Sequence, residues 1–226
     1  MSTFSERAWA ATAEVRRAID ELPFLAELGD GSLAPAVFRH YLEQDALYLA
    51  GYARALSLLA ARSPDAGAAS FWASSAHGCG VVETQLHADL LADELLGGPG
   101  RTGPQPAPSP TCLGYTSFLI ATAATAPYAV GAAAVLPCYW VYAEVGRRLA
   151  AAAAAAPGHP YRRWVAAYDA EGFQQAAREA RRITDAAAGA APHEEAAMRT
   201  AFGLAVRYEE AFWRAAHERE AWPHPL

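Results

Sequence analysis

Alanine dominates this chain and most constrains the folds that are open to it. It supplies 57 of the 226 residues, and hydrophobic residues together make up 53% of the chain. Alanine has the highest helix propensity of any residue, so this composition favours helices over sheet. No segment shows the alternation of β-branched and polar residues that is typical of a strand. We therefore predict an all-α fold, a compact bundle of seven or eight helices.

Turn residues divide the chain into predicted helices. The first helix, Phe4 to Ile19, is expected to end before the Glu21-Leu22-Pro23 break. The cluster Gly29-Asp30-Gly31-Ser32 marks a turn, with Ser32 as the expected cap of the next helix. The proline-rich stretch from Gly97 to Pro110 is a predicted loop. The remaining helices are expected at about Pro35 to Arg62, Asp65 to Leu96, Leu113 to Thr125, Tyr128 to Ala155, Tyr161 to Ala167, Gly172 to Ala187 and Pro192 to Glu218.

A long stretch from Thr102 to Ala143 carries no charged residue and is long enough to suggest a membrane span. It is rich in Ala, Gly, Thr and Pro, and Pro127 and Pro137 interrupt it. Such weak hydrophobicity suits a helix buried inside a bundle, so we expect no contact with a membrane. The alanine tracts at 150–156 and 186–191 are expected to be helix ends rather than linkers. Residues 1–226 are therefore predicted to form one domain.

Charge and cysteine content exclude several classes of protein. The 18 basic residues are all arginine against 24 acidic residues, a net charge of −6. Without lysine the chain can neither form a Schiff base nor complete a Walker A phosphate loop, and its acidic balance argues against nucleic-acid binding. Three cysteines with no CxxC spacing make neither a disulfide framework nor a metal knuckle. The N-terminus is charged and lacks a signal-peptide pattern, so a cytoplasmic location is expected.

Cys138 lies in a polar and aromatic segment of an otherwise apolar predicted helix. Pro137 removes a backbone donor and should kink the helix next to this cysteine. Tyr142 follows four residues later and is predicted to share its face. The alternative interpretation is a small buried hydrophobic residue, which is also our interpretation of Cys79 and Cys112.

Two acidic clusters offer candidate carboxylates. Asp45 and Tyr48 are three residues apart within an apolar and aromatic surrounding, so Asp45 either faces the interior or lies on a solvated helix face. Glu209 and Phe212 have the same spacing on the last predicted helix. Since neighbouring helical residues point about 100° apart, at most one of Glu209 and Glu210 is expected to face a pocket, and the spacing does not distinguish them.

The chain resembles the TenA family, the thiaminase II or aminopyrimidine aminohydrolase proteins of thiamine salvage. The resemblance covers nearly the whole chain and rests on short motifs that occur in this order. They are Leu22-Pro23-Phe24, Gly29-Asp30-Gly31-Ser32-Leu33, Phe38-Arg39-His40-Tyr41-Leu42-Glu43-Gln44-Asp45, Tyr115-Thr116-Ser117, Leu136-Pro137-Cys138-Tyr139-Trp140, Tyr161-x-x-Trp164 and Tyr208-Glu209-x-x-Phe212-Trp213. The family fold is a haem-oxygenase-like helical bundle, in agreement with the all-α prediction.

The resemblance implies an enzyme that converts 4-amino-5-aminomethyl-2-methylpyrimidine to the hydroxymethylpyrimidine and cleaves thiamine. Cys138 matches the nucleophile of the family and Glu209 its acid/base. Asp45 matches the carboxylate that holds the aminopyrimidine edge. Pocket positions are matched by Tyr48, Tyr115, Tyr142, Tyr168 and Phe212, with Tyr161 competing for the place of Tyr168. The family also implies a homotetramer.

Two other functions remain open on the sequence. A non-catalytic pyrimidine-binding protein of the same fold would not need both Cys138 and Glu209. A di-iron oxidase would need facing Glu and His ligands, and Glu83 with His87 is the only suggestive pair. No metal site is evident, and we expect no cofactor.

Overall fold

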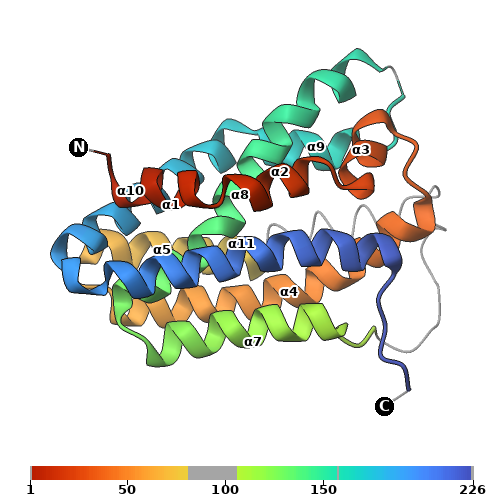
Figure 1. Ribbon diagram of the computed structural model, residues 1–226. Coiled ribbons are helices and arrows are strands. Elements are labelled where there is room, and N and C mark those ends of the chain that lie inside the picture. Colours follow the sequence, from red (N-terminus) through yellow and green to blue (C-terminus); the bar gives the residue numbers. More distant parts are fainter. Residues whose placement is uncertain (1, 81–105, 157, 225–226) are drawn as a thin grey trace.

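Every regular element is helical in the part of the chain that the computed structural model describes, residues 2–80, 106–156 and 158–224 (Figure 1). The all-α prediction is confirmed, although these residues form ten α-helices rather than seven or eight. The helices are α1 (Phe4–Ala11), α2 (Ala13–Asp20), α3 (Pro23–Asp30), α4 (Pro35–Arg62), α5 (Ala66–Gly78), α7 (Pro110–Thr125), α8 (Tyr128–Ala155), α9 (Arg162–Asp169), α10 (Glu171–Ala190) and α11 (Glu195–Glu218).

Helix α8 forms the centre of the bundle. It contacts α4, α7, α9, α10 and α11, and α4 runs alongside α7 and α11 (Figure 1). Its residues 132–136 are completely buried. A helix that is apolar on all sides can be stable in water only when neighbouring helices cover it, and the small alanine side chains let those neighbours approach closely. This helix is long and apolar enough to cross a membrane, but 89% of its most apolar window is buried by the rest of the chain, as in a core helix.

The predicted first helix, Phe4 to Ile19, is wrong as a single element because the chain breaks at Thr12. The Thr12 hydroxyl donates to the carbonyls of Ala8 and Trp9, each at 3.1 Å. Such bonds from a threonine to the preceding turn compete with the regular helix and bend it. The result is two short helices, α1 and α2, in place of one.

The segment between α2 and α4 also differs from expectation. Pro23 begins α3 rather than marking only a break, because proline suits the first position of a helix. Ser32 is not the cap of α4, since the cap position is Ala34 and no side chain bonds the helix end there. Ser32 instead donates its backbone N–H to Asp30 Oδ1 at 2.8 Å, within the turn.

The other predicted helices are present with shifted ends. Helix α7 begins at Pro110, three residues earlier than expected, because the Ser109 hydroxyl accepts from the backbone N–H of Cys112 at 3.2 Å. A 3-10 turn, Pro192–Glu194, precedes α11. Helices α8 and α10 end within the two alanine tracts, as predicted. Asp65 caps α5, whereas the predicted continuation over 81–96, the loop over 97–105 and the pair Glu83 and His87 lie outside the described residues.

The N-terminal helices dock on the central bundle through a stack of rings. Trp9 of α1 stacks on Trp140 of α8 with ring centroids 4.0 Å apart. The guanidinium of Arg16 lies 3.8 Å from the Trp9 ring centre, and that of Arg181 lies 3.8 Å from the Trp140 ring centre. Each end of the indole pair is therefore covered by a cation, an arrangement that the negative faces of the rings favour.

Candidate active site

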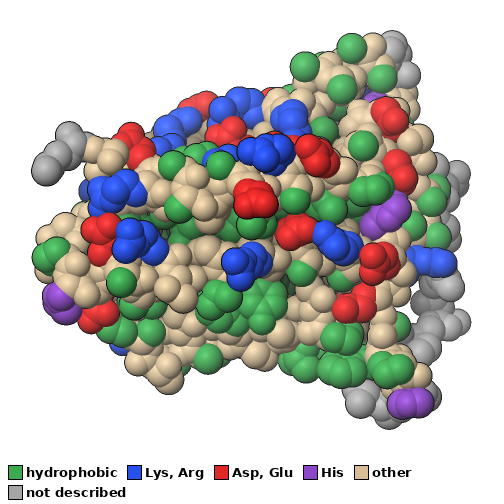
Figure 2. Space-filling view, viewed as in Figure 1, with side chains coloured by type: hydrophobic (Ala, Val, Ile, Leu, Met, Phe, Trp, Pro, Cys, Tyr) green, Lys and Arg blue, Asp and Glu red, His purple; other side chains and the backbone are tan. Residues whose placement is uncertain are grey.

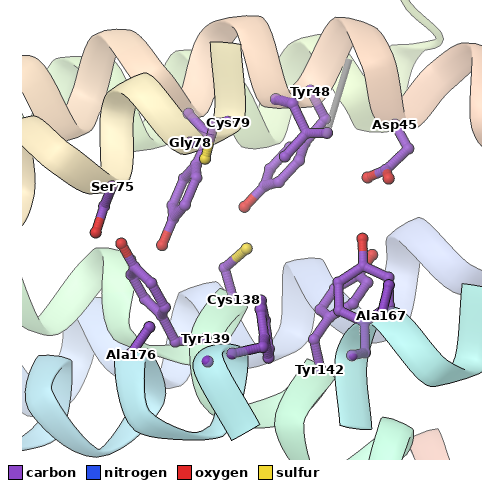
Figure 3. Close-up of a pocket in the computed structure, with 15 residues that line it drawn as sticks. Asp45, Tyr48, Ser75, Gly78, Cys79, Cys138, Tyr139, Tyr142, Ala167 and Ala176 are labelled. Carbon is purple, nitrogen blue, oxygen red and sulfur yellow. The ribbon is translucent and has the colours of Figure 1, made fainter. Parts of the chain in front are cut away.

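A cavity of about 400 Å³ opens between α4, α5, α8, α9 and α10 (Figure 3). It is mostly apolar, and its described lining includes five tyrosines, two cysteines and one charged side chain. The lining residues are Asp45, Tyr48, Leu49, Tyr52, Ser75, Gly78, Cys79, Cys138, Tyr139, Tyr142, Ala167, Tyr168, Gly172, Phe173 and Ala176. An apolar cavity of this size with a few polar groups is typical of a small-molecule site.

Cys138 lies midway along this cavity. Figure 3 shows its sulfur and the Tyr48 hydroxyl pointing towards each other from opposite walls. Tyr142 lines the same cavity one turn further along α8, so the predicted shared face is confirmed. The Cys138 thiol is half-buried and lines the cavity rather than being enclosed in the core, and its role as a nucleophile stays a prediction.

Asp45 provides the carboxylate of the cavity. Its side chain is 2% exposed, which rules out the solvated helix face. The Tyr41 hydroxyl lies 3.3 Å from Asp45 Oδ2 and 3.4 Å from the Tyr142 hydroxyl. A buried carboxylate needs hydrogen-bond donors, and the Tyr41 hydroxyl, which also lies next to the Tyr142 hydroxyl, is one of them.

Glu209 is the buried member of the glutamate pair on α11. It is 1% exposed, and the Tyr115 hydroxyl donates to its Oε1 at 2.6 Å. Burial raises the pKa of Glu209 to about 8, the Tyr115 hydrogen bond lowers this pKa and the charge of Asp45 raises it. Glu210 forms an ion pair with Arg214 nearer the surface. The structure thus distinguishes the two glutamates that spacing could not.

Three of the predicted site residues do not line the cavity but form a layer behind it: Tyr115, Glu209 and Phe212. The rings of Tyr115 and Phe212 lie 5.0 and 5.4 Å from the ring of Tyr48, which does line the cavity. Burial raises the pKa of the Tyr48, Tyr115 and Tyr142 hydroxyls well above the ordinary value. These phenols are therefore neutral and able to donate hydrogen bonds at physiological pH.

Tyr168 lines the cavity, whereas its competitor Tyr161 does not. The Tyr161 hydroxyl bonds the carbonyl of Leu33, and its ring packs 4.4 Å from Phe38. Tyr168 reaches the cavity because α9 approaches α8 closely at Gly146. A Cβ atom on Gly146 would lie 2.7 Å from the backbone carbonyl carbon of Tyr168, closer than real atoms pack.

Sequence reasoning missed several lining residues, above all Ser75 of α5, Cys79 directly after α5, and Tyr139 of α8. Cys79 is buried as predicted, yet it faces the cavity. Cys112 fits the structural interpretation, since its thiol donates to the Gln44 carbonyl at 3.5 Å and burial raises its pKa to about 12. No group of three or more potential metal ligands occurs within residues 2–80, 106–156 and 158–224.

The fold and the cavity together define a class of protein: an all-α bundle with an aromatic-lined cavity of small-molecule size. Comparison with known proteins names the family. The chain belongs to the TENA/THI-4/PQQC family, whose sequence profile matches residues 11–219.

Individual relatives agree with this family. The chain is 41% identical over 220 residues to the thiamine biosynthesis multifunctional protein ThiED of Corynebacterium efficiens, covering 97% of this chain but only 29% of that longer protein. It is 34% identical to the aminopyrimidine aminohydrolase of Bacillus subtilis, covering 97% of this chain and 92% of the relative. The solved structure of the TenA homologue from P. horikoshii superposes with a TM-score of 0.85 at 24% identity, covering 96% of this chain and 99% of that one, which shows the shared fold.

Proposed function

We propose that this protein is an aminopyrimidine aminohydrolase of thiamine salvage, which releases hydroxymethylpyrimidine from 4-amino-5-aminomethyl-2-methylpyrimidine and also cleaves thiamine. The observation that carries this proposal is a cysteine thiol midway along an aromatic cavity with a buried carboxylate at one end. The aminopyrimidine aminohydrolase named among the relatives supports it.

Asp45 is the proposed recognition group for the ring. An aminopyrimidine presents N–H donors along one edge, and an ionised carboxylate accepts such donors with charge-assisted strength. The flat ring would lie among Tyr48, Tyr142 and Tyr168, which supply stacking surface. Held at this edge, the ring would bring its reacting carbons towards Cys138.

Cys138 is the proposed nucleophile. Its sulfur adds to the electron-poor pyrimidine ring, and the electron pair gained by the ring expels the group on the 5-methylene carbon. Water then bonds to that carbon, and the sulfur departs. A thiolate is a better nucleophile for this step than a hydroxyl in the cavity, because a thiol is far more acidic than an aliphatic hydroxyl and burial raises the pKa of the lining phenols Tyr48 and Tyr142.

Glu209 is the proposed source and acceptor of protons. With a pKa of about 8, its carboxyl is protonated at neutral pH and can still give up its proton, which is the property of an effective acid/base. Because Glu209 lies one layer behind the cavity lining, a hydroxyl or a water molecule must relay the proton. The Tyr115 hydroxyl, which donates to Glu209, is the proposed first step of this relay, since its ring lies 5.0 Å from the ring of the lining residue Tyr48.

We further propose a cytoplasmic homotetramer. Its support is a group of apolar side chains on the outer surface between α7 and α11, where Figure 2 shows hydrophobic residues gathered among charged ones. Leu113 and Leu204 are 44% and 40% exposed, and Phe118 stacks on Tyr208 at 5.6 Å. Contact between subunits would remove this apolar surface from water.

The test compares wild type, Cys138→Ser and Glu209→Gln for release of hydroxymethylpyrimidine. We expect both variants to bind the pyrimidine while turnover collapses. Cys112→Ser is the matched control, since Cys112 is buried outside the cavity and should leave turnover unchanged. Turnover at the wild-type rate by Cys138→Ser would exclude the covalent step. Binding without turnover in the wild type itself would make the protein a pyrimidine-binding module.

A further inference from the structure

Tyr168 reaches the cavity from the end of a short helix. Helix α9 spans eight residues, and Tyr168 is the last but one of them. So short a helix is not stable by itself, and the carbonyls of its last turn have no partner within the helix. The carbonyl of Tyr168 therefore needs a donor from another element, and the position of the Tyr168 ring depends on neighbouring helices.

Gln174 of α10 supplies this donor. Its Nε2 donates to the carbonyl of Tyr168 at 3.1 Å and to the carbonyl of Ala143, on α8, at 3.0 Å. A side-chain amide nitrogen carries two hydrogens, so these two bonds use both of them. The Gln174 side chain is buried. One amide group thus joins α8, α9 and α10 at a single point.

Arg147 fixes the orientation of this amide. Its Nη2 donates to Gln174 Oε1 at 3.3 Å, and both residues line a polar groove between α8 and α10. The reversed amide would place its oxygen against two carbonyl oxygens and its nitrogen against a guanidinium, where no hydrogen bond forms. The two hydrogens of Gln174 are therefore committed to the carbonyls of Ala143 and Tyr168.

The residues that Gln174 joins belong to the cavity wall or adjoin it. Tyr168 lines the cavity, Ala143 follows the lining residue Tyr142, and Phe173, another lining residue, precedes Gln174. The ring centroid of Tyr168 lies 5.0 Å from that of Tyr142 and 5.1 Å from that of Phe173. Gln174 is not itself in the described lining. It can act on the cavity only through the groups that it holds.

Two contacts with α8 oppose each other at Tyr168. The close approach of Gly146 to the Tyr168 backbone resists any movement of α9 towards α8. The Gln174 amide, which bridges the carbonyls of Ala143 and Tyr168, resists separation of the two helices. Loss of this bridge would leave two carbonyls with one hydrogen bond fewer and would release α9 on the side where Gly146 does not constrain it.

We infer that Gln174 is a positioning residue of the site: by bridging α8 and α9 it sets where the Tyr168 ring lies, and hence how tightly the cavity holds a planar aromatic ligand. The inference rests on the proposed function, which supplies the aminopyrimidine as that ligand. Gln174 takes no part in the making or breaking of bonds. Its loss should weaken binding and leave the chemical step intact.

The test compares Gln174→Met, which keeps the length of the side chain and removes its donors, with wild type. Calorimetry gives Kd for hydroxymethylpyrimidine, and turnover of 4-amino-5-aminomethyl-2-methylpyrimidine gives KM and kcat. An aromatic stacking contact is worth about 2- to 12-fold in affinity, so Kd and KM should rise by that factor while kcat stays within about twofold. Gln175→Met is the matched control, because Gln175 is exposed and accepts from Arg178 of the same helix at 2.7 Å. It should leave all three constants unchanged.

A double-mutant cycle with Tyr168 separates positioning from general stabilisation of the fold. If Gln174 acts through the Tyr168 ring, Gln174→Met should raise Kd in the wild-type background and add nothing further in the Tyr168→Ala background. A residue that only holds the fold together would instead lower kcat at unchanged KM, because a fraction of the protein would be inactive, and it would do so in both backgrounds.

Gln174→Glu is a second variant, since an ionised carboxylate of nearly the same shape cannot donate to either carbonyl. A raised Kd in either variant that vanishes in the Tyr168→Ala background supports the inference. An unchanged Kd in both variants, an equal effect with and without Tyr168, or loss of the folded state in both variants overturns it. Wild-type protein that binds hydroxymethylpyrimidine but converts no aminopyrimidine overturns the proposed function, while the binding cycle still decides the role of Gln174. Wild-type protein that does not bind hydroxymethylpyrimidine overturns both.

Discussion

Replacing Glu209 with glutamine should change how the stability of the protein depends on pH. Glu209 is buried, and its pKa of about 8 lies far above the ordinary value of 4.5. The folded protein therefore binds this proton more tightly than the unfolded chain does. Protonated Glu209 therefore contributes to the free energy of unfolding. This contribution is complete below pH 4.5 and is lost as the pH rises towards 8, because Glu209 ionises at lower pH in the unfolded chain than in the folded protein.

The size of this effect follows from the two pKa values. One pKa unit corresponds to about 1.36 kcal/mol, so the difference between 4.5 and about 8 corresponds to about 5 kcal/mol of unfolding free energy. Urea unfolding of wild type and Glu209→Gln, measured between pH 5 and pH 9, should show the wild type losing about 1.4 kcal/mol per pH unit relative to the variant up to pH 8 and little beyond.

The glutamine variant isolates this one group, since every other titrating side chain is common to both proteins. Parallel stability curves would refute the reasoning, because they would mean that Glu209 is ionised in the folded protein at neutral pH. The variant Tyr115→Phe provides a second test of the Glu209 pKa. The Tyr115 hydrogen bond lowers the pKa of Glu209, so its removal should move the upper end of the titration to higher pH.

Three further predictions concern the ring edge, the helix contact and the assembly. Asp45→Asn should weaken hydroxymethylpyrimidine binding in calorimetry by about ten- to a hundredfold, the effect of losing a charge-assisted hydrogen bond; an unchanged constant would remove Asp45 from the site. Gly146→Ala should lower the unfolding free energy by about 1–3 kcal/mol in urea, because its methyl group meets the Tyr168 backbone, and undiminished stability would contradict that contact. Light scattering should show a tetramer, and a monomer at micromolar concentration would leave the apolar surface unexplained.

The long helices were predictable because local signals and burial agree along them. Helix α4 begins at Pro35 and α8 ends in an alanine tract, both as the sequence indicated. The N-terminal region was less predictable, since the break at Thr12 depends on a side chain that bonds the preceding turn and on the docking of Trp9 against Trp140. Neither contact leaves a periodic pattern in the sequence.

The residues of the candidate site also fall into two groups, those that the sequence could indicate and those that only the structure reveals. Asp45, Cys138 and Glu209 are chemically distinctive residues in aromatic segments, so they could be proposed from the sequence. Ser75 and Ala176 line the cavity without any such signal, because a small residue in a helix usually means only close packing. What makes them part of the site is the space that they leave next to a thiol, and only the packing of α5 and α10 against α8 reveals that space.

The stacked indoles of Trp9 and Trp140 give the protein an optical reporter of its own. Two indole rings 4.0 Å apart and nearly parallel, at an angle of 10°, couple their electronic transitions. Such a pair produces a paired signal in ultraviolet circular dichroism that disappears when the rings separate. Because one ring belongs to the first helix and the other lies two residues from Cys138, undocking of the N-terminus beside the helix of the nucleophile can be followed without any label.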